Sequence, residues 1–158
     1  MKQIAMRMKQ LLAASRSRPL AQAELHECEK LRRALADGYV LAQKLTLRPG
    51  QFQRRSRRVA HLLKVTVTGP GFVHKTATMN LSSGGFAALL PDEPSAQARA
   101  DFTLHTRFGG LQGKARIVSA VRRDRDWLTS FAIDEMNERA RRALDDIVLE
   151  QVLATLTN

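Results

Sequence analysis

Cysteine, aromatic residues and long apolar runs are all scarce in this 158-residue chain. A single cysteine, Cys28, cannot form an internal disulfide, so nothing points to an oxidising compartment. Aromatic residues are only 5% of the chain, so a core has to be built mainly from aliphatic side chains. Lys2, Arg7 and Lys9 interrupt the N-terminal stretch, and no apolar run is long enough for a signal-peptide core or a membrane span. We therefore expect a cytoplasmic protein with no membrane span.

The usual signatures of catalysis and metal binding are also missing. The chain has no Walker-type loop and no Gly-x-Gly-x-x-Gly motif, and Ser82 and Ser83 do not lie in a Gly-x-Ser-x-Gly elbow. The four histidines are scattered, with no partner at metal-ligand spacing. We therefore predict that the protein is not an enzyme and holds no metal or cofactor. The histidines are His26, His61, His74 and His105.

Positive charge is present in excess. Lys and Arg number 26 against 15 Asp and Glu, which gives a net charge of +11 at pH 7. A field of that sign attracts phosphate groups, whether they belong to nucleic acid, to a nucleotide or to an anionic lipid headgroup. The simpler alternative is that the basic residues only keep the protein soluble. A specific site is needed to decide between these interpretations.

The chain is predicted to consist of two unlike parts: a helical extension and linker over residues 1–49, and a β-rich domain over residues 50–158. In the first part, apolar residues recur at helical spacing over residues 3–14 and 20–45. Pro49-Gly50 then marks a turn or linker. A short amphipathic helix cannot bury its apolar stripe alone, so we expect these helices to fold back as a hairpin, pack on the second part or pair with another subunit.

The second part has the pattern of short strands. Leu63, Val65 and Val67 alternate with polar residues, and Gly- and Pro-containing turns separate similar runs that follow. Tight turns at this spacing favour an antiparallel barrel or a sandwich. An apolar stripe near the C-terminus predicts a final helix, which Asn137 can cap. The six predicted strands are residues 61–68, 72–81, 86–90, 102–108, 113–121 and 127–133.

Four arginines within five residues precede the first predicted strand. Like charges repel, so we expect this segment to be mobile until an anion binds. A guanidinium group can hold a phosphate through two hydrogen bonds, donate to O6 and N7 of guanine, or stack on a purine. Taken alone, however, a generic basic patch or linker is the simpler explanation. The arginines are Arg54, Arg55, Arg57 and Arg58.

Small polar residues and glycines mark the turn between the second and third predicted strands. Two-residue alternation points Asn80 and Ser82 to the same face of the strand, where they can hydrogen-bond the edge of a ligand. Gly84 and Gly85 can adopt positive φ or let a ligand approach the backbone closely. Taken alone, however, an ordinary hairpin turn is the simpler explanation of this cluster.

Together, the two clusters resemble the PilZ family. That family's pattern, Arg-x-x-x-Arg followed by Asp/Asn-x-Ser-x-x-Gly at the start of a barrel, matches Arg54 and Arg58, then Asn80, Ser82 and Gly85. The resemblance covers residues 51–158. It implies a mainly β fold with α-helices: a six-stranded antiparallel barrel with a C-terminal helix, here preceded by an N-terminal helical extension.

The resemblance also implies a ligand, the bacterial second messenger cyclic di-GMP. It implies that Arg54 and Arg58 grip phosphates and guanine edges, that Asn80 and Ser82 contact a guanine from the barrel wall, and that Gly85 leaves room for it. The motif assigns no role to Arg55 and Arg57, which we expect to strengthen the field or to contact the ligand secondarily.

Ligand stoichiometry and partners stay open. PilZ proteins that hold two stacked ligand molecules often have an arginine at the position of Gln53. Because this chain has glutamine there, the resemblance does not decide between one and two ligand molecules per site. We expect the ligand to fix the arginine segment, and through Pro49-Gly50 the helices, in a new position. The helices would then regulate a protein partner or a homo-oligomer.

Two other functions remain open from the sequence. The basic charge also suits a nucleic-acid-binding regulatory protein, with or without control by cyclic di-GMP, although few aromatic residues are present to stack on single strands. The third alternative is a structural adaptor whose barrel no longer binds any nucleotide. The intact motif residues argue against that loss.

Overall fold

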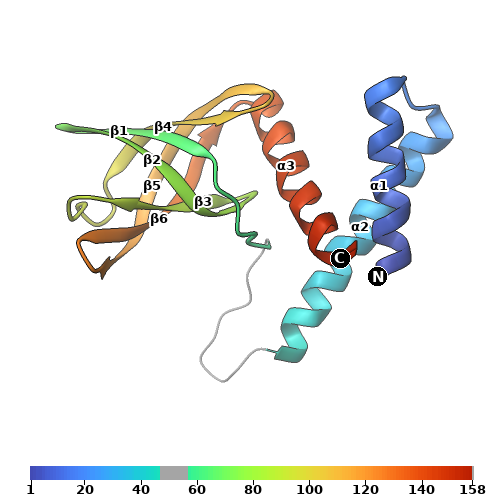
Figure 1. The fold of residues 1–158 in the computed structure, drawn as a ribbon, viewed down its shortest axis with the longest axis horizontal. Coiled ribbons are helices and arrows are strands. Elements are labelled where there is room, and N and C mark those ends of the chain that lie inside the picture. The colour runs from blue at the N-terminus through green and yellow to red at the C-terminus, as the bar shows by residue number, and fades with distance from the viewer. Residues whose placement is uncertain (47–56, 158) are drawn as a thin grey trace. The chain divides into compact units, whose positions relative to one another are not determined.

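The computed structural model describes residues 1–46 and 57–157, with residues 40–46 described by their helical backbone alone (Figure 1). The chain separates into two compact units. One comprises Met1–Arg57 with Leu149–Asn158, and the other comprises Arg58–Val148. The predicted boundary near residue 50 lies outside the described residues.

The second unit contains a closed barrel of six strands. Each strand is antiparallel to both of its neighbours, in the order β1-β2-β3-β6-β5-β4. This confirms the predicted fold class. The strands are β1 (Lys64–Gly69), β2 (Phe72–Ser82), β3 (Gly85–Leu90), β4 (Arg99–Thr106), β5 (Gly109–Arg123) and β6 (Asp126–Met136).

Tight turns join β1 to β2, β2 to β3, β4 to β5 and β5 to β6, whereas residues 91–98 form a longer connection between β3 and β4. Gly71 has φ 80° after Pro70, and Gly109 has φ 96° at the start of β5. Both glycines supply a left-handed backbone conformation that other residues rarely adopt. β5 is longer than predicted, because it begins at Gly109 and continues through Arg122 and Arg123. Charged side chains on the outer face of a barrel do not disturb the backbone ladder.

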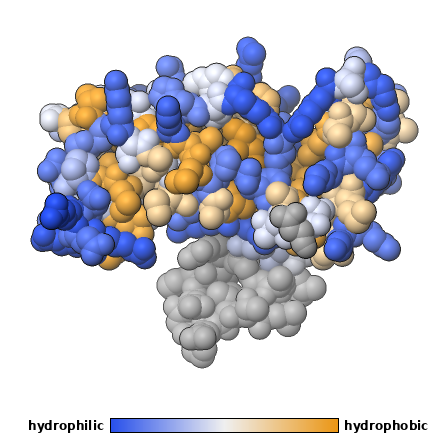
Figure 2. Space-filling view, in the orientation of Figure 1, coloured by the Kyte–Doolittle hydropathy of each residue, from blue (hydrophilic) through white to orange (hydrophobic). Residues whose placement is uncertain are grey.

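The core of the barrel is aliphatic around three stacked or tilted phenylalanines. The ring of Phe86 lies 4.7 Å from that of Phe131 and 5.2 Å from that of Phe102, measured between centroids. Val65 and Val67 of β1 are buried at alternate positions. Among those of the chain's eight aromatic residues whose burial is described, these three rings are the buried ones. On the surface, apolar side chains are exposed between hydrophilic ones (Figure 2).

Helix α3 (Glu138–Thr157) begins where the sequence placed its cap. The Oδ1 atom of Asn137 accepts a hydrogen bond from the backbone N–H of Ala140 at 2.7 Å. Leu144, Ile147 and Val148 form the buried stripe on this helix. No helix in the described ranges is long and apolar enough to cross a membrane.

The first unit is a packed group of helices. Helices α1 (Lys2–Ser17) and α2 (Gln22–Thr46) contact each other, so the hairpin is the alternative that the structure supports. Their shared core contains Met8 of α1, Leu35 of α2 and Leu153 from the last turns of α3. Where their side chains are described, the amphipathic stripes of the first two helices are thus covered within this unit.

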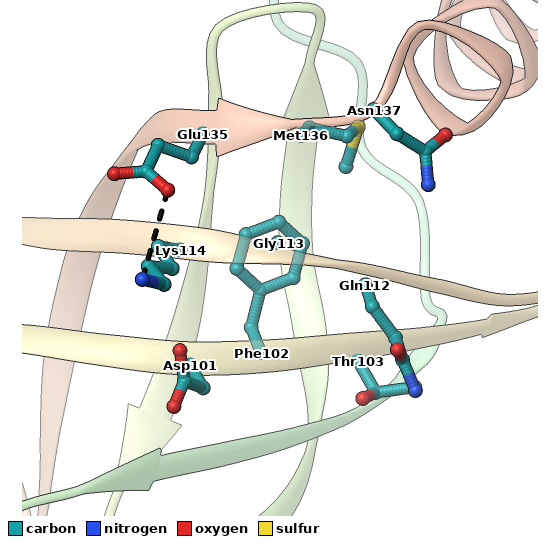
Figure 3. A pocket seen from close by; sticks show the side chains of 9 residues that line it. All are labelled: Asp101, Phe102, Thr103, Gln112, Gly113, Lys114, Glu135, Met136 and Asn137. Carbon is teal, nitrogen blue, oxygen red and sulfur yellow. Dashed lines mark ion pairs between the residues drawn. The ribbon is translucent and has the colours of Figure 1, made fainter.

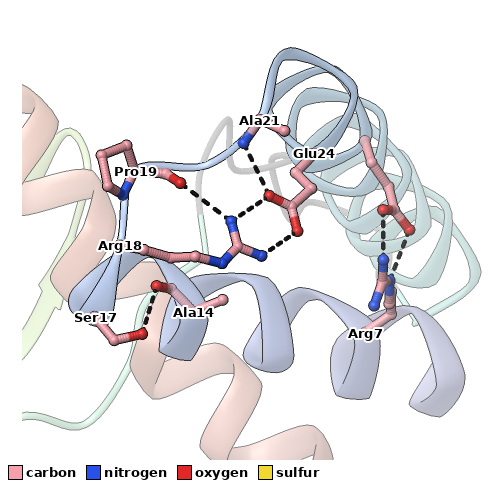
Figure 4. A network of polar contacts seen from close by, with 8 residues as sticks. Arg7, Ala14, Ser17, Arg18, Pro19, Ala21 and Glu24 are labelled. Carbon is pink, nitrogen blue, oxygen red and sulfur yellow. Dashed lines mark hydrogen bonds and ion pairs between the residues drawn. The ribbon is translucent and has the colours of Figure 1, made fainter.

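The connection between α1 and α2 is held by charged hydrogen bonds (Figure 4). Both terminal nitrogens of Arg18 donate to the carboxylate of Glu24, at 2.7 and 2.6 Å, and Glu24 also accepts from the N–H of Ala21 at 2.9 Å. The Arg18 hydrogen bonds lower the pKa of Glu24 to about 2. Because the Glu24 carboxylate accepts from the N–H of Ala21, Ala21 caps the helix and α2 begins at Gln22, not at the predicted Leu20 beside Pro19.

Candidate functional site

The arginine segment meets the barrel at one backbone bridge. Val59 and Leu81 exchange two hydrogen bonds, each with an N···O distance of 2.9 Å, in antiparallel pairing. Leu81 lies between Asn80 and Ser82. In antiparallel pairing Arg58 faces the Ser82 side of this bridge, and because Val59 and Leu81 are both buried, strand alternation turns Arg58 outward. Of the arginine cluster, the structure therefore places Arg58 beside the strand that carries Asn80 and Ser82.

Thr78 anchors the residues that follow the bridge. Its hydroxyl donates to the carbonyl of His61 at 2.5 Å and accepts from the N–H of Leu63 at 3.0 Å. Its own N–H donates to the carbonyl of Leu63 at 2.9 Å. Thr78 is fully buried. These bonds replace a regular ladder over residues 61–63, which is why β1 begins at Lys64 and not at the predicted residue 61.

Of the four arginines in the cluster, the structure describes Arg57 and Arg58. Arg54 and Arg55 lie outside the described residues. The guanidinium carbon of Arg57 lies 5.6 Å from the centroid of the Tyr39 ring, within the helical unit. Arg58 is exposed. The guanidinium of Arg57 thus rests on an aromatic face of α2, while the next residue begins the segment anchored to β2.

The hydroxyl of Ser82 is already engaged in the hairpin. It donates to the carbonyl of Gly85 at 3.1 Å, and the residue is only 6% exposed. Asn80 is half-buried and follows a β-bulge between Thr78 and Asn80, which leaves Met79 as the extra residue. Because its hydrogen is already donated to Gly85, the Ser82 hydroxyl can only accept from a ligand donor, and the atoms that cover it must first move slightly.

Gly85 is required by the barrel itself. A Cβ atom built on this residue would lie 2.1 Å from the carbonyl oxygen of Phe131 in β6. Among the described glycines, those with positive φ are Gly71 and Gly109, so neither Gly84 nor Gly85 uses that freedom. The sequence suggested that glycine here allows either positive φ or the close approach of a ligand. The structure shows a close approach, but of the β6 backbone.

Sequence reasoning missed two features beside the motif. A pocket of about 580 Å³ borders Asn80 and is lined largely by the turn between β5 and β6. The alternation of arginine and aspartate over residues 123–126 was the available signal, but it indicated only a polar turn. The second feature is Arg141 of α3, whose guanidinium donates to the carbonyl of Ser83 at 3.1 Å and so ties the helix to the β2–β3 turn.

A second pocket, of about 650 Å³, lies over β4, β5 and β6 (Figure 3). The carboxylates of Asp101 and Glu135 line it, together with Lys114, whose Nζ lies 3.7 Å from Glu135. It includes no residue of the predicted motif. Its excess of negative charge disfavours an anionic ligand. The candidate site is therefore the face around Asn80. Among described residues, no group of three His, Cys, Asp or Glu side chains is arranged to hold a metal ion.

The barrel unit matches the profile of a known protein family. The profile of the PilZ domain matches residues 52–150, which is more than half of the chain. The chain belongs to the PilZ domain family. No curated protein sequence matches it.

Solved structures share the PilZ fold at low sequence identity. MotI/DgrA, the inhibitor of motility of Bacillus subtilis, superposes with a TM-score of 0.58 at 16% identity, over 66% of this chain and 53% of MotI. The PilZ domain of YcgR from Escherichia coli with c-di-GMP superposes with a TM-score of 0.54 at 19% identity, over 66% of this chain and 95% of that domain. MrkH from K. pneumonia in its c-di-GMP complex superposes with a TM-score of 0.54 at 16% identity, over 66% of this chain and 55% of MrkH. The chain thus spans about half the length of MotI and MrkH.

Proposed function

We propose that this PilZ protein is a receptor for cyclic di-GMP that acts by binding and not by catalysis. The observation that carries the proposal is the bridge between Val59 and Leu81, which brings Arg58 beside Asn80 and Ser82. The structures of the YcgR domain and of MrkH with c-di-GMP support it, because they share the same fold.

The chemistry of these side chains suits a cyclic purine dinucleotide. The guanidinium groups of Arg54 and Arg58 offer planar donors for phosphate oxygens and for O6 and N7 of guanine. The amide of Asn80 both donates and accepts, as the edge of a guanine requires. Each phosphate keeps one negative charge, which the arginine segment neutralises.

Binding is proposed to work as a switch on the helical unit. The arginine segment is fixed to β2 from Val59 onward, while Arg57 rests on Tyr39 of α2. A ligand that gathers the arginines over the barrel face competes with that contact. The helices would then change position and expose or hide a surface for a protein partner or a second copy of the chain. The predicted cytoplasmic location and the alternative of nucleic-acid binding stay predictions from composition.

Calorimetric titration of cyclic di-GMP tests the proposal. Arg54→Ala, Arg58→Ala and Ser82→Ala should each weaken binding at least about tenfold, because each removes a hydrogen bond to the ligand, charged in the case of the arginines. The matched control is Arg99→Ala on β4, which stands three strands from β3 in either direction around the barrel. Unchanged affinity in both arginine variants, or no binding by the unmodified protein, would overturn the proposal.

A further inference from the structure

The pocket beside Asn80, here called the hairpin pocket, has an apolar floor and a charged rim. Its floor consists of the side chains of Met79, Leu89 and Leu128. Its rim consists of Asn80 and the four residues of the β5–β6 turn. Those four are Arg123, Asp124, Arg125 and Asp126.

Strand register places the floor and rim on the outer face that carries the motif. Leu89 pairs with Leu128, and Arg123 pairs with Asp126, two residues from Leu128 along β6. Residues two apart on a strand share a face, so Asp126 and Leu128 point the same way. Asn80 pairs with Ala87, which is likewise two residues from Leu89. The hairpin pocket is therefore a continuation of the proposed binding face along β3 and β6.

The rim charges are balanced, and this argues for a neutral occupant. Two arginines and two aspartates cancel, so the pocket has no net attraction for a phosphate. The pocket instead combines guanidinium hydrogen-bond donors, carboxylate acceptors and an apolar surface. A flat heterocycle with both acceptors and donors on its edges matches that set.

Guanine has the matching edge pattern. Its O6 and N7 atoms accept hydrogen bonds from an arginine fork, and its N1–H and N2 amino groups donate to a carboxylate. Adenine has no N1–H donor, so it satisfies the aspartates less well. Arg123 and Arg125 are both exposed, and within the described residues neither guanidinium group forms a hydrogen bond or ion pair, so their side-chain donors are available.

We infer that the hairpin pocket holds one guanine base of the bound cyclic dinucleotide. Arg123 and Arg125 donate to its O6 and N7 edge, and Asp126 accepts from its N1–H and N2 amino groups. This inference rests on the proposed function and adds the β5–β6 turn to the site. It makes the turn a determinant of base specificity, whereas Arg54 and Arg58 act on the phosphates and the other guanine.

The test measures affinity and base discrimination together. Cyclic di-GMP and cyclic di-IMP, whose hypoxanthine bases lack the N2 amino group, are titrated into the unmodified protein and into Arg123→Ala, Arg125→Ala and Asp126→Ala. Each arginine variant should bind cyclic di-GMP about tenfold more weakly, the effect of losing one specific guanine contact. Asp126→Ala should lose most of the preference for cyclic di-GMP over cyclic di-IMP. Arg99→Ala serves as the charge-matched control, and melting curves confirm that every variant folds.

The outcomes separate the two proposals. If Ser82→Ala weakens binding but both turn arginine variants stay within twofold of Arg99→Ala, the hairpin pocket is not part of the site and the receptor function stands. The same conclusion follows if Asp126→Ala keeps the full preference for cyclic di-GMP. If the unmodified protein binds neither nucleotide, the receptor function fails and the inference fails with it.

Discussion

At the scale of single residues, the geometry of the site depends on side chains that never need to touch a ligand. Thr78 is fully buried and holds both His61 and Leu63, so it fixes the segment that presents Arg58. Gly85 allows β3 to approach the carbonyl of Phe131. Neither residue needs to contact the ligand, yet both determine the positions of the backbone segments that carry the contacting residues.

Thr78→Val tests the anchoring role. Valine keeps the shape but leaves the carbonyl of His61 and the N–H of Leu63 without their partner, which should cost about 1–3 kcal/mol of unfolding free energy. Because the arginine segment is then less well held, affinity for cyclic di-GMP should also fall several-fold in calorimetry. Denaturant unfolding measures the first effect.

The control for this prediction is Thr106→Val on β4. The Thr106 hydroxyl donates to the carbonyl of Gly109 at 2.9 Å and accepts from the N–H of Phe108 at 3.0 Å, so it supports the β4–β5 hairpin and not the arginine segment. It should lower stability without a comparable loss of affinity. Equal loss of affinity in both variants would show that Thr78 acts only through general stability.

At the scale of elements, the connection between α1 and α2 should make the helical unit sensitive to acid. The hydrogen bonds from Arg18 lower the pKa of Glu24 from 4.5 to about 2, so the folded state favours the carboxylate. The resulting stability is fully present above about pH 4.5, and it is lost as the pH falls from there to about 2. Melting of the helical circular dichroism signal should therefore shift downward across that window.

Glu24→Gln removes this contribution and should flatten the pH dependence of the melting temperature between pH 4.5 and 2. Glu29→Gln is the control, because Glu29 is exposed on the same helix and outside the Arg18 network. If Glu24→Gln and the unmodified protein show the same slope, the Arg18–Glu24 pair does not hold α2 in solution.

The contact between Arg57 and α2 makes a second prediction at this scale. Tyr39→Leu removes the ring that Arg57 covers while keeping an apolar side chain in the helix. An exposed cation–π contact contributes about 0.5–1 kcal/mol, so its loss should strengthen ligand binding about two- to fivefold. Phe108→Leu, which removes the ring beneath Arg107 on the β4–β5 hairpin, is the control and should change nothing. Weaker binding by Tyr39→Leu would contradict the competition proposed for the switch.

At the scale of the whole molecule, the net charge of +11 attracts any phosphate ligand, and salt dependence tells the candidates apart. A dinucleotide with two phosphates should lose less than about tenfold in affinity between 50 and 200 mM salt. A duplex held through 6–10 phosphate contacts would lose about 10³–10⁵-fold over that range. We expect the shallow response for cyclic di-GMP and no submicromolar duplex binding at 150 mM salt. Tight duplex binding without any messenger response would favour the nucleic-acid alternative.

Much of the architecture was predictable because it is encoded locally. Two-residue alternation and glycine-containing turns located all six strands, and Asn137 marked the start of α3. The ends of the elements were less predictable. Serine hydroxyls that bond to preceding carbonyls extend α1 to Ser17, and the carboxylate of Glu24 delays the start of α2. Such effects depend on side-chain geometry that a hydropathy pattern does not contain.

From sequence alone, the short motif of Arg54, Arg58, Asn80, Ser82 and Gly85 could be recognised, together with its resemblance to PilZ domains. Only the folded chain decided how Arg58 meets the strand that carries Asn80 and Ser82, because barrel closure joins strands that are distant along the chain. It pairs Val59 with Leu81 and sets β3 beside β6. The same closure brings the β5–β6 turn to Asn80, more than forty residues away in sequence. Local patterns determine each strand, whereas the neighbours of a strand depend on long-range backbone hydrogen bonds that no local pattern records.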